Sequence, residues 1–336
     1  MKFRAELSVK RWMKTITYKD QIMLMGSCFT EHIGKYLTDR KFNTLSNPNG
    51  ILFNPASIAN TLSSYIDNRI YSKEDLFVLN DMYASWGYHS QFSNTNIEAC
   101  LQTVHAAQQT AHQYIQTTKW LIITWGSAFV YKLTQKAKSN NSLASKQVGD
   151  IVANCHKAPA DWFDRQLLSV EEILNIYTTL INNLCAYNHQ LRIIFSISPV
   201  RHLREGLIDN NKSKAVLIQA VHQLCEKFDF AHYFPAYELV IDDLRDYRFY
   251  AEDLVHPNHQ ATQYVWEKFV EMCIHADSVL VMQAIEKIRA AYLHKPLHPQ
   301  SQQHRAFLKS YVDKIQLLQQ QFPTLDFLSE IHYFNT

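Results

Sequence analysis

Three short apolar segments of the chain each end in a turn. The first is followed by Gly26-Ser27-Cys28, the second by Trp125-Gly126-Ser127 and the third by Ser198-Pro199. Apolar runs of this length, bounded by turn residues, indicate strands buried on both faces of a sheet. The segments predicted as strands are Ile22 to Met25, Trp120 to Thr124 and Ile193 to Ile197.

Between these segments, apolar residues recur at helical spacing. Ser169 and Glu172 form a capping box, which marks the start of a helix that we expect to reach Leu184. Asn258 is placed to cap another helix through Phe269. Alternating strands and helices predict a parallel sheet covered by helices on both faces. The other predicted helices start at Phe29 and span about 97–115 and 214–228.

Two stretches interrupt this alternation. Residues of about 50–95, rich in Asn, Ser and Tyr, are expected to form an insertion above the strand ends. The tail from about Ser278 carries two helix-like segments split by Lys295-Pro-Leu-His-Pro. We therefore predict an α/β domain over residues 1–277 and a C-terminal helical extension over 278–336 that packs on it.

Composition excludes several classes of function. The chain has 336 residues, of which 47% are hydrophobic, which is enough for a sizeable core. Its 33 Lys and Arg nearly balance 31 Asp and Glu, so we expect no nucleic-acid partner. We find no signal peptide or membrane helix, and six scattered cysteines without a CxxC pair suggest reduced thiols. These features predict a soluble, cytoplasmic protein with no membrane partner.

The turn Gly26-Ser27-Cys28 places a hydroxyl between a strand and a helix. At such a turn a serine is exposed, and the helix N-terminus stabilises developing negative charge. Ser27 is therefore a candidate nucleophile, although a serine there can also simply cap the helix. Cys28 is intrinsically the better nucleophile as a thiolate, but adjacent side chains diverge in this turn, and we expect Cys28 to lie in the core.

Asp253 lies three residues before His256 near the C-terminal end of the predicted domain. An acid at this spacing can accept the Nδ1 hydrogen of the histidine and leave Nε2 free to take a proton from a serine. The spacing alone is weak evidence, because the chain has 16 histidines. Ser27 and this pair would nevertheless meet at the carboxyl edge of a doubly wound sheet, where such folds bind ligands.

Several further blocks resemble the GSCFA family, within the SGNH/GDSL-like hydrolases, and they occur in order along most of the chain. The blocks are Gly26-Ser-Cys-Phe-Thr30, Phe53-Asn-Pro-Ala-Ser57, Thr124-Trp-Gly-Ser127, Asn154-Cys-His-Lys157, Ser198-Pro-Val-Arg-His202 and Tyr250-Ala-Glu-Asp-Leu-Val-His-Pro257. The resemblance implies a flavodoxin-like three-layer α/β/α fold with an insertion after the second strand. It also implies that Ser27 is the nucleophile, His256 the general base and Asp253 the acid that orients it.

The resemblance also implies an oxyanion hole. Besides the Ser27 backbone N–H, Gly50 matches the glycine that the wider superfamily has after its second strand. The superfamily asparagine after the third strand is missing, because this chain has Gly126-Ser127-Ala128 there. Ser127 and Asn154 are the candidate replacements, and Asn154 is preferred because an amide N–H₂ can always donate.

Five further residues are expected to surround a substrate. Arg201 would hold a carboxylate, a phosphate or a polarised carbonyl, and the aromatic groups would stack on a sugar or a flat acyl group. The alternative is that Arg201 pairs with a structural acid and the histidines lie on the surface. His89, His156 and His202 lack the close i, i+4 spacing of a helical zinc site, so we expect neither metal nor cofactor. The remaining candidates are Trp86, His89, His156 and His202.

These observations predict a serine esterase that removes a small acyl group, such as acetyl, from a sugar or another polar alcohol. The substrate class rests on the resemblance. Acyl transfer to an alcohol other than water would use the same three residues. The alternative is a protein of the same fold that binds a ligand without catalysing a reaction. The missing oxyanion asparagine is the reason to consider it. The oligomeric state is not predicted.

Overall fold

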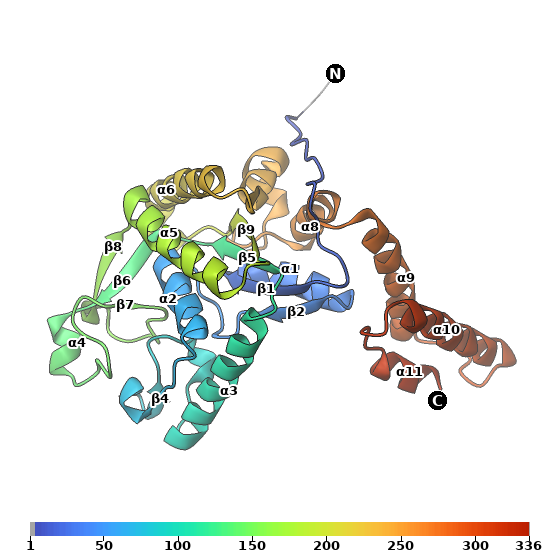
Figure 1. Cartoon of the computed structure of the whole chain (residues 1–336), viewed down its shortest axis with the longest axis horizontal. Coiled ribbons are helices and arrows are strands. Elements are labelled where there is room, and N and C mark those ends of the chain that lie inside the picture. The colour runs from blue at the N-terminus through green and yellow to red at the C-terminus, as the bar shows by residue number, and fades with distance from the viewer. Residues whose placement is uncertain (1–3, 336) are drawn as a thin grey trace. The chain divides into compact units, whose positions relative to one another are not determined.

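A five-stranded parallel sheet forms the centre of the computed structural model, which describes residues 4–335 (Figure 1). Met1–Phe3 and Thr336, at the ends of the two predicted domains, lie outside the described residues. The strand order is β10-β9-β5-β1-β2, which is a doubly wound order of the flavodoxin type. The predicted α/β fold class is confirmed. The strands are β1 (Gln21–Gly26), β2 (Asn43–Ser46), β5 (Trp120–Trp125), β9 (Arg192–Ile197) and β10 (Ala231–Phe234).

Alternate residues of the central strands face two layers of helices. Met25 of β1 pairs with Ile123 of β5, which pairs with Phe195 of β9, and all three belong to one buried cluster. The same cluster includes residues of α2 (Pro55–Ile66), α3 (Ile97–Ile115), α5 (Val170–Tyr187) and α6 (Gly206–Lys227). On the other face, Gly34 of α1 (Cys28–Asp39) lies against Leu24. Both faces are covered, as in a three-layer α/β/α fold.

Local signals in the sequence explain where several helices begin. Ser169 and Glu172 form the predicted capping box of α5, with hydrogen bonds of 3.1 and 2.7 Å. The Asn258 side chain accepts a hydrogen bond from Ala261 N at the start of α8 (His259–Cys273), as expected. The helix predicted to begin at Lys214 begins earlier, at Gly206.

The region predicted as an insertion contains one helix of the main fold. Helix α2 packs in the central core, so the irregular segment starts after Ile66. It contains a hairpin of β3 (Phe77–Leu79) and β4 (Met82–Ala84). Asn80 and Asp81 turn the hairpin with positive φ angles of 49° and 61°, a conformation that these two residue types tolerate.

A second small sheet follows β5 and was not predicted. It is antiparallel, in the order β7-β6-β8, and comprises β6 (Phe129–Leu133), β7 (Ile151–Val152) and β8 (Phe163–Leu167). Phe77 and Trp86 of the irregular segment share a buried cluster with Val152 and Trp162 of this region. Two stretches far apart in the sequence thus form one subsidiary core beside the main one.

Short helical segments complete the first part of the chain. Most belong to the loops that follow strands of the three sheets. They are η1 (Lys73–Asp75), η2 (Ser90–Phe92), α4 (Gln135–Ser139), η3 (Ala160–Trp162), η4 (Leu203–Glu205), α7 (Ala236–Glu238), η5 (Leu239–Leu244) and η6 (Tyr247–Phe249).

The chain divides into two compact units. The first contains residues up to Ser8, Gln21–Gly34 and Thr44–Val265, and the second contains Val9–Asp20, Lys35–Asn43 and the residues from Trp266 on. The predicted boundary at 277/278 falls inside helix α9 (Ala276–Leu293), and the second unit begins before it.

The second unit is helical and has its own polar and aromatic contacts. The predicted break between two helices lies between α9 and α10 (Gln302–Gln321), and α11 (Leu328–Phe334) follows. Arg40 Nε donates to Glu286 Oε1 at 2.7 Å, and the rings of Tyr18 and Phe42 stack with centroids 4.2 Å apart. Among the described residues of the whole chain, no helix is both long and apolar enough to cross a membrane.

Candidate active site

Ser27 lies in the turn between β1 and α1. Gly26 has a φ of +151°, and a Cβ atom there would meet Thr124 O at 2.3 Å, so only glycine fits this close approach to β5. Gly26 N donates to Asn47 Oδ1 at 2.8 Å, and Ser27 N donates to Thr124 O at 3.2 Å. The turn is therefore held from both neighbouring strands of the sheet.

The Ser27 hydroxyl is not a helix cap. Ser27 is 4% exposed, and its Oγ has no hydrogen-bond partner within residues 4–335. A buried hydroxyl without a partner costs about 1–3 kcal/mol, which a capping role would have avoided. Because Oγ is covered, a substrate carbonyl can reach it only after side chains above it move.

Asp253 and His256 form a compact loop just before α8. Asp253 Oδ1 accepts from the backbone N–H of Val255 and of His256, at 2.9 and 3.0 Å. Its Oδ2 lies 2.7 Å from His256 Nδ1. The hydrogen bond from the His256 backbone N–H and the contact with its ring lower the pKa of Asp253 to about 2, so the carboxylate is ionised at neutral pH.

The position of His256 relative to Ser27 follows from its neighbours. His256 is close enough to His32 of α1 and to His202 to lower the pKa of both, although burial is the larger cause in each case. His202 in turn packs on Gly126 and contacts the ring of Phe53 at a tilt of 40°, and the Phe53 carbonyl accepts from Gly126 N at 2.7 Å. These residues are at the carboxyl edge of the sheet, where Ser27 also lies. Ser27 and His256 are not hydrogen-bonded to each other.

A buried lysine forms hydrogen bonds with two loops at this edge of the sheet. Lys214 of α6 is 2% exposed, and its Nζ donates to Gly126 O at 2.6 Å and to Ser198 O at 2.7 Å. It therefore joins the loop after β5 to the loop after β9. Burial lowers the pKa of Lys214 to about 7. Lys214 was predicted only as the start of a helix, although Asn210, Ser213 and Lys214 are polar residues on a helix face that is otherwise apolar.

Three of the four predicted oxyanion donors are already engaged. The Ser27 N–H bonds to Thr124 O, and the Gly50 N–H bonds to Asn47 O at 2.7 Å. Ser127 Oγ contacts Ser213 Oγ at 3.2 Å and accepts from Phe129 N at 3.1 Å, which turns it toward α6 and β6. Asn154 uses its Oδ1 to accept from His156 N at 2.7 Å. The predicted residues therefore do not form an oxyanion hole with free donors in this conformation.

Asn47 lies next to the candidate nucleophile and was not predicted as a site residue. It is 7% exposed, and its Oδ1 is held by the backbone N–H next to Ser27, while its Nδ2 has no partner in the described part of the chain. His202 Nε2 is likewise buried without a partner. Burial lowers the pKa of His202 to about 4, with smaller effects of Lys214 and His256, so its ring is neutral at pH 7. The position of Asn47 directly after β2 is the feature of the sequence that could have identified it as a site residue.

Cys28 does not have the environment of a reactive thiol. It is half-buried, and burial raises the pKa of its thiol. A raised pKa disfavours the thiolate, which is the nucleophilic form. Cys28 was expected in the core, but it is only half-buried at the start of α1.

Arg201 borders a pocket beside the Asp253–His256 loop. Its guanidinium lies 4.2 Å from the ring centroid of Tyr250 and 5.0 Å from that of Tyr247, and its backbone N–H bonds to Val255 O. The pocket has a volume of about 270 Å³ and is also lined by Asp242 and Arg245. No acid forms an ion pair with Arg201 in the described residues.

Of the other three predicted substrate residues, Trp86 and His156 lie in the subsidiary core, whereas His89 lies against the loop after β2. Trp86 is 1% exposed and stacks on Phe77 in the subsidiary core, with Nε1 donating to Ser142 O, so its ring cannot stack on a substrate. His156 packs edge-on against both rings, and burial lowers its pKa to about 4. His89 lies against Gly50, where a glycine Cβ would meet His89 Cβ at 2.4 Å.

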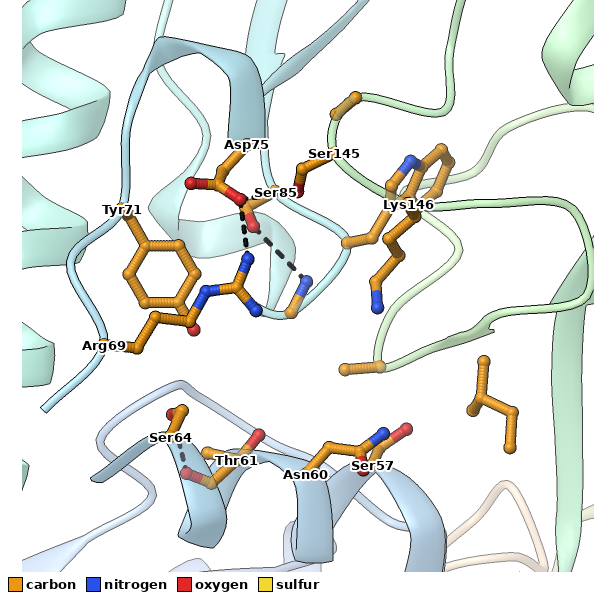
Figure 2. Close-up of a pocket in the computed structure, with 15 residues that line it drawn as sticks. Ser57, Asn60, Thr61, Ser64, Arg69, Tyr71, Asp75, Ser85, Ser145 and Lys146 are labelled. Atoms are coloured by element: carbon orange, nitrogen blue, oxygen red, sulfur yellow. Dashed lines mark hydrogen bonds and ion pairs between the residues drawn. The ribbon is translucent and has the colours of Figure 1, made fainter. Parts of the chain in front are cut away.

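A separate polar pocket lies between α2, the irregular segment and the loop after α4 (Figure 2). Its volume is about 70 Å³, and its lining includes Arg69, Asp75 and Lys146. Among the described residues, no cluster of three or more His, Cys, Asp or Glu side chains could hold a metal ion.

The fold and the site define a doubly wound α/β protein with a serine and an Asp–His pair at the carboxyl edge of its sheet. A family model described as "GSCFA family" matches residues 21–269, and one described as "GSCFA domain protein, C-terminal domain" matches residues 285–336. The chain belongs to the GSCFA family.

Two solved structures are similar to this chain. One is a carbohydrate esterase family 3 protein from Talaromyces cellulolyticus, with 10% identity and a TM-score of 0.34, covering 80% of this chain and 99% of that chain. The other is the acetyl xylan esterase Est2A from the rumen bacterium Butyrivibrio proteoclasticus, with 9% identity and a TM-score of 0.35, covering 76% and 63%. A search of curated proteins found no match.

Proposed function

We propose that the protein is a serine esterase that uses Ser27, His256 and Asp253. The observation that carries the proposal is that a buried Ser27 hydroxyl without a partner lies at the same edge of the sheet as a histidine whose Nδ1 is 2.7 Å from an ionised aspartate. An aspartate in this position fixes the tautomer of the histidine, so that Nε2 can accept a proton. The resemblance to SGNH-like hydrolases supports the same assignment of roles.

The reaction is acyl transfer to water. His256 Nε2 takes the proton of Ser27 as Oγ attacks the ester carbonyl, and the same proton passes to the leaving alcohol oxygen. Water then attacks the acyl-enzyme with His256 again as the base, which releases a carboxylic acid and restores Ser27. For this to occur, the two side chains must come within hydrogen-bonding distance when substrate binds, as is common for catalytic contacts that are loose in a free enzyme.

Two side chains supply the oxyanion donors in this proposal. Asn47 Nδ2 is fixed because Oδ1 of the same amide is bound to Gly26 N, the residue that precedes the nucleophile. His202, being neutral, donates from Nε2 when that nitrogen carries the proton. An oxyanion would satisfy both of these buried groups, which lack partners in the free protein. Asn47 thus takes the part that was predicted for Asn154 or Ser127.

The substrate is a small acyl ester of a polar alcohol. The pocket at Arg201, Tyr247 and Tyr250 adjoins the His256 loop and offers aromatic faces together with charged groups, which suits a hydroxylated leaving group. Transfer to a second alcohol instead of water would use the same residues.

The test is hydrolysis of p-nitrophenyl acetate and butyrate by the wild type, Ser27→Ala and Cys28→Ala. We expect activity in the wild type and in Cys28→Ala, and its loss only in Ser27→Ala. Loss only in Cys28→Ala would move the nucleophile to the thiol.

A ligand-binding protein without turnover is the second candidate, and the covered Ser27 Oγ favours it. No activity in the wild type with either p-nitrophenyl ester, or with acetylated sugars, would support this second candidate against the first.

A further inference from the structure

The pocket beside α2 contains a cation without a counter-ion. Lys146 reaches from the loop after α4 toward α2, where Ser57 and Asn60 lie (Figure 2). Its Nζ has no hydrogen bond or ion pair among residues 4–335. The side chain is half-buried, and this burial lowers the pKa of Lys146. Attraction to Asp150 and Asp75 opposes this lowering only in part, so Lys146 is a partly desolvated ammonium group without a direct ion pair in the described residues.

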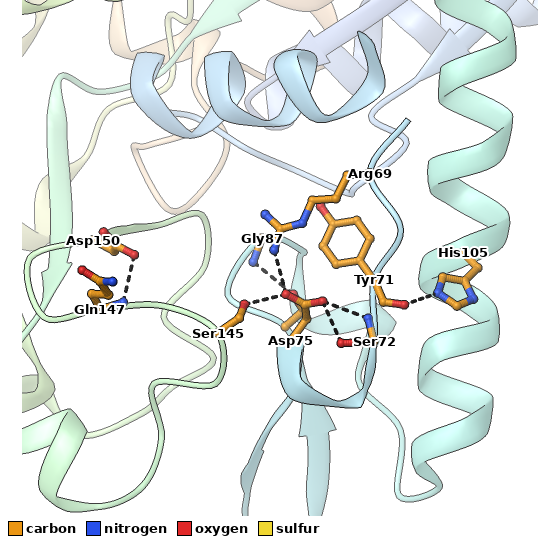
Figure 3. Close-up of polar contacts among 10 residues, drawn as sticks. Arg69, Tyr71, Ser72, Asp75, Gly87, His105, Ser145, Gln147 and Asp150 are labelled. Atoms are coloured by element: carbon orange, nitrogen blue, oxygen red, sulfur yellow. Dashed lines mark hydrogen bonds and ion pairs between the residues drawn. The ribbon is translucent and has the colours of Figure 1, made fainter. Parts of the chain in front are cut away.

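The other charges of the pocket already satisfy each other. Asp75 accepts from Arg69 Nη2 at 2.7 Å, from the Ser72 backbone N–H at 2.8 Å and from Ser145 Oγ (Figure 3). Burial acts to raise the pKa of Asp75, but these hydrogen bonds and the Arg69 charge together lower it, so the carboxylate is ionised. Asp150, the other nearby acid, accepts from Gln147 N at 2.9 Å and forms no ion pair with Lys146. The lining therefore has one net positive charge.

The size and chemistry of the pocket limit what can fill it. Its volume is about 70 Å³. One ordered water needs about 10–15 Å³ on this scale, so a ligand of a few heavy atoms fits and a sugar ring does not. The groups opposite Lys146 are the amide of Asn60 and the hydroxyls of Thr61 and Ser64, which suit hydrogen-bonding ligands rather than apolar ones.

We propose that this pocket binds a small carboxylate that carries a hydroxyl group, with Lys146 Nζ as its counter-ion and the polar side chains of α2 contacting the rest of the ligand. A singly charged anion balances the lining, whereas a dianion such as sulfate would leave an excess of negative charge beside Asp75. The site is separate from Ser27 and does not depend on the esterase proposal.

Removing a lysine that serves structure should destabilise the protein, because its partners would lose their contacts. Lys146 has no partner to lose, and its charge is unfavourably buried in the empty protein. We therefore expect Lys146→Gln to leave the midpoint of urea unfolding unchanged or slightly raised, while the ligand affinity falls. Loss of binding without loss of stability is the signature of a ligand-binding lysine.

The experiment uses glycolate as the probe, at constant ionic strength set with NaCl, with isothermal titration and saturation-transfer NMR as the readouts. The full-length variants are Lys146→Gln, Asn60→Asp and the matched control Lys138→Gln, an exposed lysine of α4. Asn60 is exposed on α2, so Asn60→Asp adds a negative charge to the pocket rim with little effect on folding. Ethylene glycol and sulfate are tested in parallel.

We expect glycolate to bind the wild type and Lys138→Gln equally, and both pocket variants at least tenfold more weakly. Ethylene glycol should not bind, and sulfate should bind more weakly than glycolate. The proposal is overturned if the wild type does not bind glycolate, if Lys146→Gln and Asn60→Asp bind it as the wild type does, or if sulfate or ethylene glycol binds as well as glycolate.

Discussion

The edge of the sheet around Ser27 and the pocket at Lys146 are both polar, but they differ in which atoms lack partners. At the sheet edge, Ser27 Oγ, Asn47 Nδ2 and His202 Nε2 are buried neutral groups with no hydrogen bonds in the described chain. In the pocket, the buried acid Asp75 is fully engaged and only a half-exposed cation is left over.

This difference indicates two kinds of task. Each buried polar group without a partner costs about 1–3 kcal/mol, so the three at the sheet edge call for an explanation, and a reacting group that uses them is the one we propose. A single cation with access to water costs less and suits reversible binding of an anion. In the two proposals, the sheet edge stabilises a short-lived charge that appears during a reaction, and the pocket binds a ligand that is charged before it binds.

The largest effect is expected at Asp253. Asp253→Asn should lower kcat for p-nitrophenyl acetate by about 10²–10⁴-fold, because an amide cannot hold His256 in the right tautomer. Glu252→Gln, the exposed neighbouring acid, is the control and should leave kcat within twofold. Similar kcat values in the two variants would remove Asp253 from the mechanism and weaken the contrast with the pocket.

The next effect concerns Asn47. Asn47→Asp keeps the oxygen that accepts from Gly26 N but removes the N–H₂ donor, and it tolerates the positive φ of 44° at this position. We expect kcat to fall by about 10²–10³-fold with little change in KM, as for the loss of one oxyanion donor. Asn154→Ala is the comparison. A larger loss of kcat in Asn154→Ala than in Asn47→Asp would show that Asn154, as predicted from the sequence, is the oxyanion donor.

A smaller effect, on stability, is expected for Lys214. Its pKa of about 7 in the folded protein lies below the ordinary value of about 10.4 for an unfolded chain, so the unfolded chain binds more protons between these values. The free energy of unfolding should therefore rise by about 2 kcal/mol from pH 7 to pH 9 in the wild type relative to Lys214→Met.

Urea unfolding at several pH values measures this difference. A neutral amine has two N–H groups, which is enough for Gly126 O and Ser198 O, so both hydrogen bonds survive deprotonation. A difference that does not change with pH would show that Lys214 keeps an ordinary pKa in the fold.

Much of the fold could be predicted because its strongest elements carry local signals. The buried strands β1, β5 and β9 are continuous apolar runs, and α5 has a capping box. β2 is polar and only partly buried, and β6 to β8 mix charged with apolar residues. Their pairing depends on partners distant in sequence, so no local pattern reveals them.

In the candidate site, too, contacts between residues close in sequence could be predicted, whereas contacts that depend on tertiary packing could not. Asp253 and His256 are three residues apart, and their contact could be predicted from spacing alone. The position of Asn47 beside Gly26 depends on the pairing of β2 with β1, and that of Lys214 under two loops depends on the packing of α6. Trp86 was predicted to face a substrate because of its residue type, but its burial with Phe77 follows from the tertiary structure.

The most direct test of the central claim is labelling by a fluorophosphonate probe, followed by peptide mass spectrometry. The probe reacts only with a serine that a neighbouring base activates. We predict one labelled residue, Ser27, with labelling abolished in Ser27→Ala and His256→Ala and retained in Cys28→Ala. An unlabelled wild type, or label on another residue, would contradict the assignment of Ser27 as an activated nucleophile.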